Sequence, residues 1–529
     1  MTQWARAPED RQQMVLFSRR LDDALSPVHP VRLLDDILGR IDWSPWESRY
    51  HVRVGQPAIH PRVLAGVLLY GILRRIRSSR GLEEALGVRL DFRWLAEGRT
   101  IDHTTLSEFR RTRGSELKNL FVQLGLLAQQ AGWLSLQELA FDGTRIRANN
   151  RRTGTRTPEE LQQLKLELSA KFSELEARAA AEDAREEETF GTGSAHQLPA
   201  EMADVQRRRE QVEAALAELQ RVEAAGETLP KRLPLTDPQS RLTPNKEGGF
   251  APNYTPLATV DMASGMIVSS SVIAMTNEDQ HLVAAVEDVQ QAFHLEQPPA
   301  AVLADGLMAS GANLAALEEK GVALYSPVPL PAEVNPALRD DPSQPVPPEQ
   351  WNQLPEKTVK CKGRQYQQLD KEAFVYDAGQ DCYWCPQGQR LEYRNTTKEA
   401  RVTGPAAERL RYLANPAACA VCPLRKRCLT PGTQRREVSH DQFEAHRKRH
   451  VQRMATPAAK SRYARRSQVC ERPFAVIKQH YGVRQFLLRG LAMVGIEWDW
   501  LTTAFNLSRL MSLLRSRAGP PAALSPQPS

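Results

Sequence analysis

The chain has 529 residues, of which 41% are hydrophobic and 25% charged, and its formal net charge is +7. This composition excludes a mainly disordered chain and a membrane-embedded one. The longest apolar stretch, Val63 to Leu73, is much shorter than the ~20 residues that cross a bilayer. The N-terminal residues hold no apolar signal-peptide core, so we expect a cytoplasmic protein without a membrane partner.

Residues 1–136 are predicted to be helical. Leu64, Leu68 and Leu69 recur at the spacing of a buried helix face, and Asp102 precedes a later helix as a candidate cap. Short helices with clustered arginines suit a helix-turn-helix-like domain that contacts DNA. The alternative is a plain helical bundle with a basic surface. The candidate DNA contacts here are Arg74, Arg75, Arg77 and Arg80.

The next segments alternate in character. A short apolar run, LQELAFDG, predicts a strand that ends in a carboxylate, and the Ala-, Glu- and Leu-rich segment 156–228 predicts a helical hairpin. Residues 250–328 alternate strand and helix patterns, as in an α/β layer. Residues 329–435 are rich in Pro and Cys, 436–517 are predicted to be mainly helical, and 518–529 form a tail expected to be disordered.

One segment carries the basic excess. Between Pro431 and Gly490 there are 14 Lys and Arg against 4 Asp and Glu. Such a local surplus attracts polyanions such as nucleic acid, although a solvated surface is the alternative.

Three acidic residues are candidates for metal-dependent chemistry. Asp142 and Asp305 each follow a strand-like run, and Glu471 lies on a predicted helix. A carboxylate at the end of a strand projects from the sheet edge, where ligands collect in α/β folds. Three carboxylates from distant parts of a chain can hold two Mg²⁺ ions, which promote in-line attack on a phosphodiester.

Several blocks of the sequence resemble one family in the same order. HPRVLAGVLLYGILRR with the residues up to DHTTLSEFRR resembles the N-terminal domain of bacterial insertion-sequence transposases of the DDE type. DGTRIRAN, DPQSRLTPNKEGGFAPNYTPLATVDMASGMIV, LADGLMAS and ERPFAVIKQHYGVRQFLLRGL resemble that family's catalytic blocks. The resemblance implies a ribonuclease H-like core that cuts and joins DNA, with Asp142, Asp305 and Glu471 as catalytic residues that bind two Mg²⁺ (or Mn²⁺) ions. It also implies double-stranded DNA partners, namely terminal inverted repeats and target DNA, and a homodimer on that DNA.

The predicted fold class is therefore α+β and multidomain, with a helical N-terminal domain and a ribonuclease H-like α/β core interrupted by two insertions. In order, the expected parts are the helical DNA-binding domain 1–136, the first core segment 137–155, the helical hairpin 156–228, the second core segment 229–328, the Pro-rich and Cys-rich insertion 329–435, the last core segment 436–517 with the Glu471 helix, and the tail 518–529.

The third block departs from the family signature, Tyr-x-x-Arg-x-x-x-Glu-x6-Lys, at one point. Glu471 and Lys478 keep the six-residue gap, whereas four residues separate Arg466 from Glu471. Lys478 falls two helical turns after Glu471, where a cation can hold a DNA phosphate. The predicted DNA contacts of this block are Tyr463, Arg466, Arg472 and Lys478. The second block also differs, because Asp305-Gly306-Leu307-Met308 lacks the tyrosine of the common Asp-x-Gly-Tyr.

Five of the seven cysteines lie between 382 and 428. Two Cys-x2-Cys pairs, at 382–385 and 419–422, have the spacing of a structural zinc site, and the alternative is reduced thiols without metal. The family resemblance points instead to a ligand set without Cys382. That set is Cys385, Cys419, Cys422 and Cys428.

Two further functions remain open at this stage. A metal-dependent nuclease has the same core without strand transfer, and an inactive derivative of a transposase binds DNA without cutting it. An inactive derivative differs from a transposase in that it does not cut DNA. A nuclease differs from a transposase in that it does not join the ends after cutting them.

Overall fold

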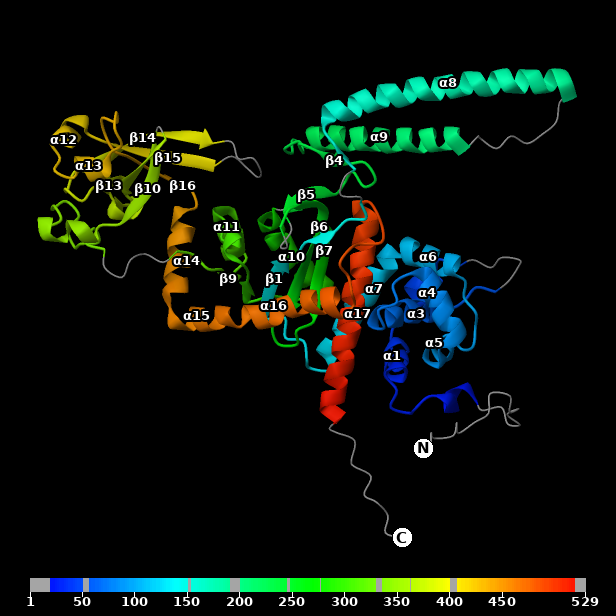
Figure 1. The fold of residues 1–529 in the computed structure, drawn as a ribbon. Helices are drawn as coiled ribbons and strands as arrows, with labels where there is room; N and C mark the ends of the chain where they lie inside the picture. Colours follow the sequence, from blue (N-terminus) through cyan, green and yellow to red (C-terminus); the bar gives the residue numbers. More distant parts are fainter. Residues whose placement is uncertain are drawn as a thin grey trace, which may run out of the picture.

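A computed structural model describes residues 20–50, 57–150, 154–190, 200–244, 248–275, 277–329, 335–361, 363–399 and 407–518. Figure 1 shows a group of N-terminal helices beside a central sheet, with a helical arm and a small β-rich lobe projecting from it. The tail expected to be disordered lies outside the described residues from 519 onward. None of the described helices combines the length and apolar character that a membrane crossing requires.

The N-terminal part consists of short helices. The residues of α3 from Val63 to Ile72 are all buried, and a helix that is apolar on all sides belongs in the middle of a bundle. The carboxylate of Asp102 accepts hydrogen bonds from the N–H groups of Thr104 and Thr105, and so caps α6. The helices are η1 (Leu21–Ala24), α1 (Pro30–Leu38), α2 (Ser44–Glu47), α3 (Pro61–Leu73), α4 (Ser79–Val88), α5 (Leu90–Leu95), α6 (His103–Thr112) and α7 (Gly114–Gln130).

The central sheet has the spatial order β7-β6-β1-β8-β9. Both β6 and β7 are antiparallel to their neighbours, whereas β8 and β9 run parallel to β1. Two short strands, β2 and β5, pair with the first half of β6. The bounds are β1 (Glu138–Gly143), β2 (Ile146–Arg147), β5 (Arg241–Pro244), β6 (Phe250–Asp261), β7 (Ile267–Ile273), β8 (Ala301–Leu303) and β9 (Ala323–Tyr325).

A long helix, α17 (Leu491–Ala518), joins the sheet to the N-terminal helices. On the sheet side, the indole N–H of Trp498 donates to the carbonyl of Leu257, and the Asn506 amide bonds both backbone groups of Ile267. On the other side, the indole N–H of Trp500 donates to the carbonyl of Arg110 in α6. One helix therefore fixes the N-terminal part against the sheet, on which α10 (Leu282–Ala292) and α11 (Gly311–Glu319) also pack.

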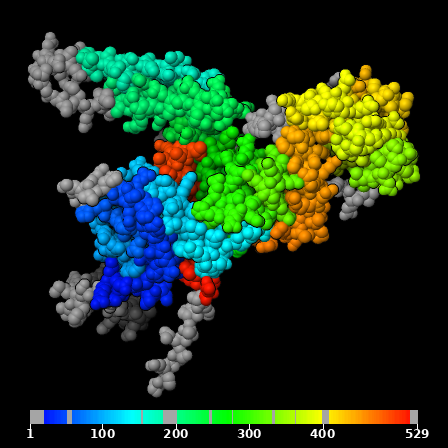
Figure 2. Space-filling view, turned by 180° about the vertical axis from the view of Figure 1, so that it is seen from behind, coloured from blue at the N-terminus to red at the C-terminus, as the bar shows by residue number. Residues whose placement is uncertain are grey.

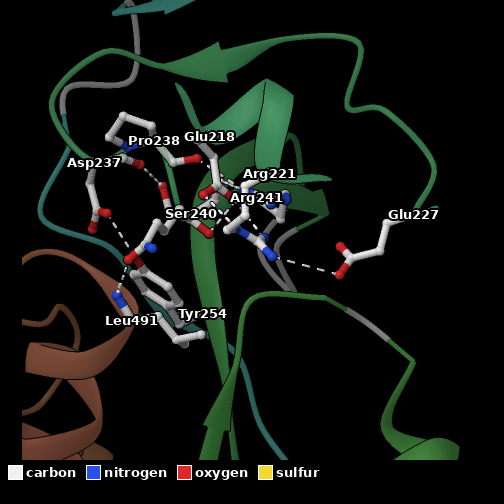
Figure 3. A network of polar contacts seen from close by, with 10 residues as sticks. Glu218, Arg221, Glu227, Asp237, Pro238, Ser240, Arg241, Tyr254 and Leu491 are labelled. Carbon is white, nitrogen blue, oxygen red and sulfur yellow. Dashed lines mark hydrogen bonds and ion pairs between the residues drawn. The ribbon is translucent and has the colours of Figure 1, made fainter. Parts of the chain in front are cut away.

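The predicted helical hairpin is present as α8 (Pro158–Phe190) and α9 (Ala200–Ala224), which pack on one another at the top of Figure 1. Its base is tied to the sheet by the polar network in Figure 3. Arg241 makes an ion pair with the buried Glu218 of α9 at 2.6 Å and donates to three consecutive backbone carbonyls before it. Asp237 accepts hydrogen bonds from the Tyr254 hydroxyl and from the N–H of Gly490, next to α17. Two more short strands, β3 (Thr155–Arg156) and β4 (Leu233–Pro234), pair where the arm begins and ends.

The Cys-rich region folds as a separate lobe with its own apolar core. Figure 2 shows this lobe and the α8–α9 arm as projections on opposite sides of the molecule. Its elements are η4 (Pro348–Gln353), β10 (Glu356–Cys361), β11 (Arg364–Leu369), η5 (Lys371–Ala373), β12 (Val375–Asp377), β13 (Cys382–Trp384), β14 (Arg390–Glu399), β15 (Ala407–Ala414), α12 (Pro416–Ala420), α13 (Arg425–Cys428) and β16 (Glu437–Asp441).

Three helices return the chain from this lobe to the sheet: α14 (Glu444–Ala455), α15 (Pro457–Ala464) and α16 (Arg466–Ala475). The segment 436–517 is thus mainly helical as predicted, although it begins with the strand β16. After α16, which contains Pro473, the chain continues as a π-helical turn, Val476–His480.

Asp499 in α17 makes the stability of the fold sensitive to pH. Burial raises the pKa of this carboxyl to about 7, while the charge of Lys118 and the hydroxyl of Ser270 lower it. A folded-state pKa above the unfolded value stabilises the fold at acidic pH, and this contribution is lost as the pH rises toward 7.

We therefore expect the free energy of unfolding in urea to fall between pH 4 and pH 8, and Asp499→Asn to reduce this fall by up to about 4 kcal/mol. The exposed Asp288 of α10 provides the control, because Asp288→Asn should leave the pH dependence as in the wild type. An unchanged slope in Asp499→Asn would contradict the assignment.

Candidate active site

Two of the three predicted acids lie side by side at one end of the sheet. β1 and β8 are parallel neighbours, and Ala140 lies opposite Leu303. Two residues further along both strands come Asp142 and Asp305. Asp305 also begins a short turn, η3 (Gly306–Met308), and its carboxylate accepts a hydrogen bond from the N–H of Leu307 at 2.9 Å. Parallel pairing of two strand ends is thus what brings these acids together.

The third acid comes from α16, which packs against β1. Glu471 is exposed on this helix. Burial raises the pKa of Asp142, and the negative charges of Asp305 and Glu471 raise it further. Carboxyl groups act on one another in this way only at short range, so the three predicted residues occupy one end of the sheet.

Arg466 reaches the same place from the start of α16. Its guanidinium makes an ion pair with Asp142 at 3.1 Å and is largely buried. This charge opposes the rise in the pKa of Asp142. Burial raises the pKa of the nearby Tyr463, and the charge of Asp305 contributes to that rise. The extra residue between Arg466 and Glu471 therefore does not keep Arg466 from the acids, and Tyr463 lies beside them.

A fourth carboxylate, Glu278, was missed by the sequence analysis. It begins the turn η2 (Glu278–His281), which follows β7 and leads into α10. Burial raises the pKa of Glu278 to about 7, with further increases from the charges of Asp142 and Asp305. In the sequence Glu278 stands in TNEDQHL, next to another acid and away from any strand end, so no pattern separates it from the other acids.

A groove with a volume of 680 Å³ opens beside the acids. Glu278 and Gly143 line it, together with the cationic side chains of Arg145, Arg147, Lys478 and Arg484. The ammonium of Lys478 donates to the hydroxyl of Thr144, which fixes it at the groove wall. Of these four cations only Lys478 was predicted, because its spacing from Glu471 was the only signal available.

Arg472 has a different position. The side chain of Arg472 is exposed. Burial lowers the pKa of Arg509, and the charge of Arg472 lowers it further. Arg509 donates to the carbonyl of Ser264, in the turn between β6 and β7. Since β6 runs antiparallel to β1, this turn lies at the end of the sheet opposite Asp142. Because Arg472 follows Glu471 directly on α16, its contact with DNA stays a prediction.

Most arginines of the 74–80 stretch hold the chain together. Arg74 lies over the Tyr70 ring and bonds its hydroxyl, and Arg75 donates to the carbonyl of His480. Arg77 makes a largely buried ion pair with Glu497 of α17 at 2.6 Å. Arg80 is exposed. Contact of this stretch with DNA stays a prediction, with Arg80 the best placed of the four.

The loop after Cys385 has the backbone geometry of a thiolate site. The N–H groups of Gln387 and Gln389 point at the Cys385 sulfur, at 3.3 and 3.4 Å. Gly388 adopts φ 69°, and a Cβ there would lie 2.1 Å from the carbonyl oxygen of Ser343. Only glycine suits this turn, and backbone N–H groups directed at sulfur stabilise a thiolate.

The other cysteines divide into two groups. Burial raises the pKa of Cys428 to about 12, and the charges of Cys385, Cys419 and Cys422 also raise it. These four thiols therefore share one part of the lobe. The pKa of Cys382 is likewise raised by burial, but its charged neighbours are acids and Arg390 rather than other cysteines. The set without Cys382 is thus the one brought together.

Within the described part of the chain, no three Asp, Glu, His or Cys side chains stand in a geometry that would hold a metal ion. The donor chemistry nevertheless suits one at both places. Carboxylate oxygens at the sheet end are the ligands of Mg²⁺, and four thiolates are those of structural zinc. A cradle is also present at the acids, because a Cβ on Gly143 would lie 2.4 Å from the Glu278 carboxylate. Both sets of residues therefore suit these ions by the chemistry of their donor atoms.

Comparison with known families gives two matches. Residues 19–112 match the model for a transposase domain (DUF772), and residues 384–511 match that for a transposase DDE domain. No curated protein matches the chain. The first match contains the 74–80 stretch and the second contains Glu471 and Lys478, whereas Asp142 and Asp305 lie outside both. A DDE domain implies the use of divalent metal ions in general.

Gly388 offers a test of the cysteine loop. Gly388→Ala should destabilise the lobe by about 1–2 kcal/mol for the left-handed backbone and by about 1–3 kcal/mol more for the clash with Ser343. Gly432, at φ 90° with open space around it, is the matched control. Gly432→Ala should therefore show only the cost of the left-handed backbone, without the cost of a clash. Urea unfolding followed by the tryptophans of the lobe measures both, and equal losses would contradict the close approach.

Proposed function

We propose that this insertion-sequence transposase of the DDE type binds the terminal inverted repeats of its own element as double-stranded DNA, cleaves them and joins the ends to target DNA. The observation that carries the proposal is the meeting of Asp142, Asp305 and Glu471 at one end of the sheet, beside a groove lined by arginine and lysine.

The order of the strands supports a ribonuclease H-like core. Numbered along the chain, the five main strands stand in the order 3-2-1-4-5, with the second antiparallel to the first and the fourth and fifth parallel to it. The arm formed by α8 and α9 is inserted between the first and second of these strands, and the Cys-rich lobe follows the fifth. Both interruptions leave the acids on the same sheet end.

The carboxylates of Asp142, Asp305 and Glu471 would hold two Mg²⁺ (or Mn²⁺) ions. Such ions, when bound, activate a water or a 3′-hydroxyl and stabilise in-line attack at phosphorus. Arg466 orients Asp142 through their ion pair and offsets the repulsion between the acids. Tyr463, on which the charges of Arg466 and Asp305 act, would contact the scissile phosphate.

The groove beside the acids would receive the DNA backbone. Arg145, Lys478 and Arg484 line it, and phosphate contacts of this kind position a duplex without reading its sequence. Lys478 is held by Thr144, two residues after Asp142, so a phosphate bound to it lies near the cleavage centre.

The N-terminal helices would supply recognition of the transposon ends. They match a transposase domain and include the exposed Arg80. Because two ends must be cut and joined together, we propose a homodimer on DNA that acts in the cytoplasm.

The Cys-rich lobe would bind one structural Zn²⁺ through Cys385, Cys419, Cys422 and Cys428. The N–H groups directed at Cys385 and the shared location of the four thiols support this set over one that includes Cys382. Four thiolates leave no open position, so such an ion would hold the lobe together rather than take part in cleavage.

Cleavage can be separated from binding by substitution. Asp142→Asn and Glu471→Gln should lower Mg²⁺-dependent nicking of end DNA by at least ~10³-fold. Both should leave DNA affinity unchanged or slightly higher, because a carboxylate repels a polyanion. Lys478→Ala should weaken binding and reduce the slope of log K against log salt by about 0.9 per lost phosphate contact.

Gel-shift titration and nicking of labelled end DNA, run side by side, measure these effects, with Asp288→Asn as the control that matches the wild type. Nicking at the wild-type rate by Asp142→Asn would remove that residue from the site. Nicking without joining would leave a nuclease, and binding without nicking in the wild type would leave a DNA-binding protein.

The zinc proposal predicts different outcomes for two neighbouring cysteines. Cys385→Ser should lose the metal and lower the melting temperature of the lobe, whereas Cys382→Ser should retain about one zinc per chain. Elemental analysis of the purified protein measures the zinc content. Loss of zinc from Cys382→Ser, with retention in Cys385→Ser, would reverse the ligand assignment.

A further inference from the structure

We propose that Glu278 is a fourth ligand for the divalent cations of the acidic end, contributed by the turn η2 rather than by a strand or by α16. This inference rests on the proposed function, because it assigns one more residue to the same metal centre.

The space for Glu278 is made by a missing side chain. Gly143 follows Asp142 directly, and a Cβ at Gly143 would lie 2.4 to 2.9 Å from three atoms of the Glu278 carboxyl group. Any other residue at 143 would displace this carboxylate from its place against the end of β1. The glycine after the first acid therefore admits the carboxylate of Glu278 to the strand end.

The turn that carries Glu278 is anchored to the second acid. The side-chain amide of Asn313 donates to the carbonyls of Asp279 in η2, at 2.8 Å, and of Met308 in η3, at 3.1 Å. Asp305 caps η3. One buried amide thus ties the turn of Glu278 to the turn of Asp305, so the position of Glu278 is fixed relative to both aspartates.

Among the described residues no cation is paired directly with Glu278, although the charges of Arg145 and Arg466 lower its pKa. Asp142 has Arg466, and Asp305 accepts a backbone hydrogen bond. Across the described residues, no hydrogen bond or ion pair reaches the half-buried carboxylate of Glu278. Burying an ionised carboxylate is costly unless a cation or donors compensate it. A divalent ion at the acidic end would supply that compensation.

The test measures metal binding directly, without DNA and without catalysis. Titration of Mn²⁺ followed by electron paramagnetic resonance gives the dissociation constants of the full-length protein. Glu278→Gln keeps the size of the side chain and removes its charge, and should weaken Mn²⁺ binding by about ten-fold or more. Glu287→Gln on α10, an exposed partner of Lys320, is the matched control and should bind as the wild type.

A double-mutant cycle tests the role of Gly143. Gly143→Ala should weaken Mn²⁺ binding because its Cβ displaces the Glu278 carboxylate. When Glu278→Ala is already present, nothing remains to displace, so Gly143→Ala should cost little more. Equal, additive losses from both changes would show that Gly143 acts on something other than Glu278 and would overturn the geometric argument.

The outcomes distinguish this inference from the proposed function. If the wild type binds Mn²⁺ and Asp142→Asn weakens it, the metal centre stands, and unchanged binding by a folded Glu278→Gln then rejects Glu278 alone. If the wild type binds no Mn²⁺ and does not nick end DNA, the proposed function itself fails. Melting curves of every variant establish that a loss of binding is not a loss of fold.

Discussion

The mutual repulsion of four carboxylates at one end of a sheet is the constraint around which this chain is arranged. Burial raises the pKa of Asp142 and of Glu278, and the charge of Asp305 raises both further, with a contribution from Glu471 at Asp142 and from Asp142 at Glu278. A single buried cation, Arg466, opposes them through its ion pair with Asp142. The charge of Arg145 also acts on Glu278, and Arg145, Lys478 and Arg484 line the neighbouring groove. The acids therefore stand beside a cationic wall, and their carboxylate oxygens have the donor chemistry that divalent cations prefer.

The same end of the molecule is held to the N-terminal helices by a second buried charge. Glu497 of α17 accepts hydrogen bonds from the N–H groups of Leu487 and Leu488 and makes an ion pair with Arg77. The loop that ends in these residues begins at the π-helical turn of Lys478. The N-terminal helices are therefore joined to the wall of the groove through packed helices and buried polar contacts rather than through a linker.

Local patterns in the sequence mark the three proposed acids but not their neighbours, for a physical reason. Asp142 and Asp305 end apolar strand-like runs and Glu471 stands at a fixed spacing from a lysine, so local pattern marks them. Glu278 carries no such mark, because its importance comes from a tertiary contact with a glycine more than a hundred residues away. Arg77 is the opposite case, since an arginine-rich stretch indicates a surface for DNA whereas this side chain makes a largely buried ion pair with Glu497. A sequence pattern predicts a helix or a strand, whereas the contacts between helices and strands determine which charged side chains remain available to bind a ligand.

The Cys-rich lobe is inserted between Asp305 and Glu471. This insertion leaves the acids in place because the two chain segments that connect the lobe to the sheet are bonded to one another beside Asp305. His450 of α14, almost fully buried, donates from its ring to the carbonyl of Ser326, just after β9. The hydroxyl of Ser326 in turn donates to the carbonyl of Asp305. Burial lowers the pKa of His450 and so favours the neutral ring, while its hydrogen bond to the Ser326 carbonyl opposes this shift. The returning helix is thus pinned beside Asp305 before the chain reaches Glu471, so the geometry of the acids depends on this closure and not on the structure of the lobe beyond it.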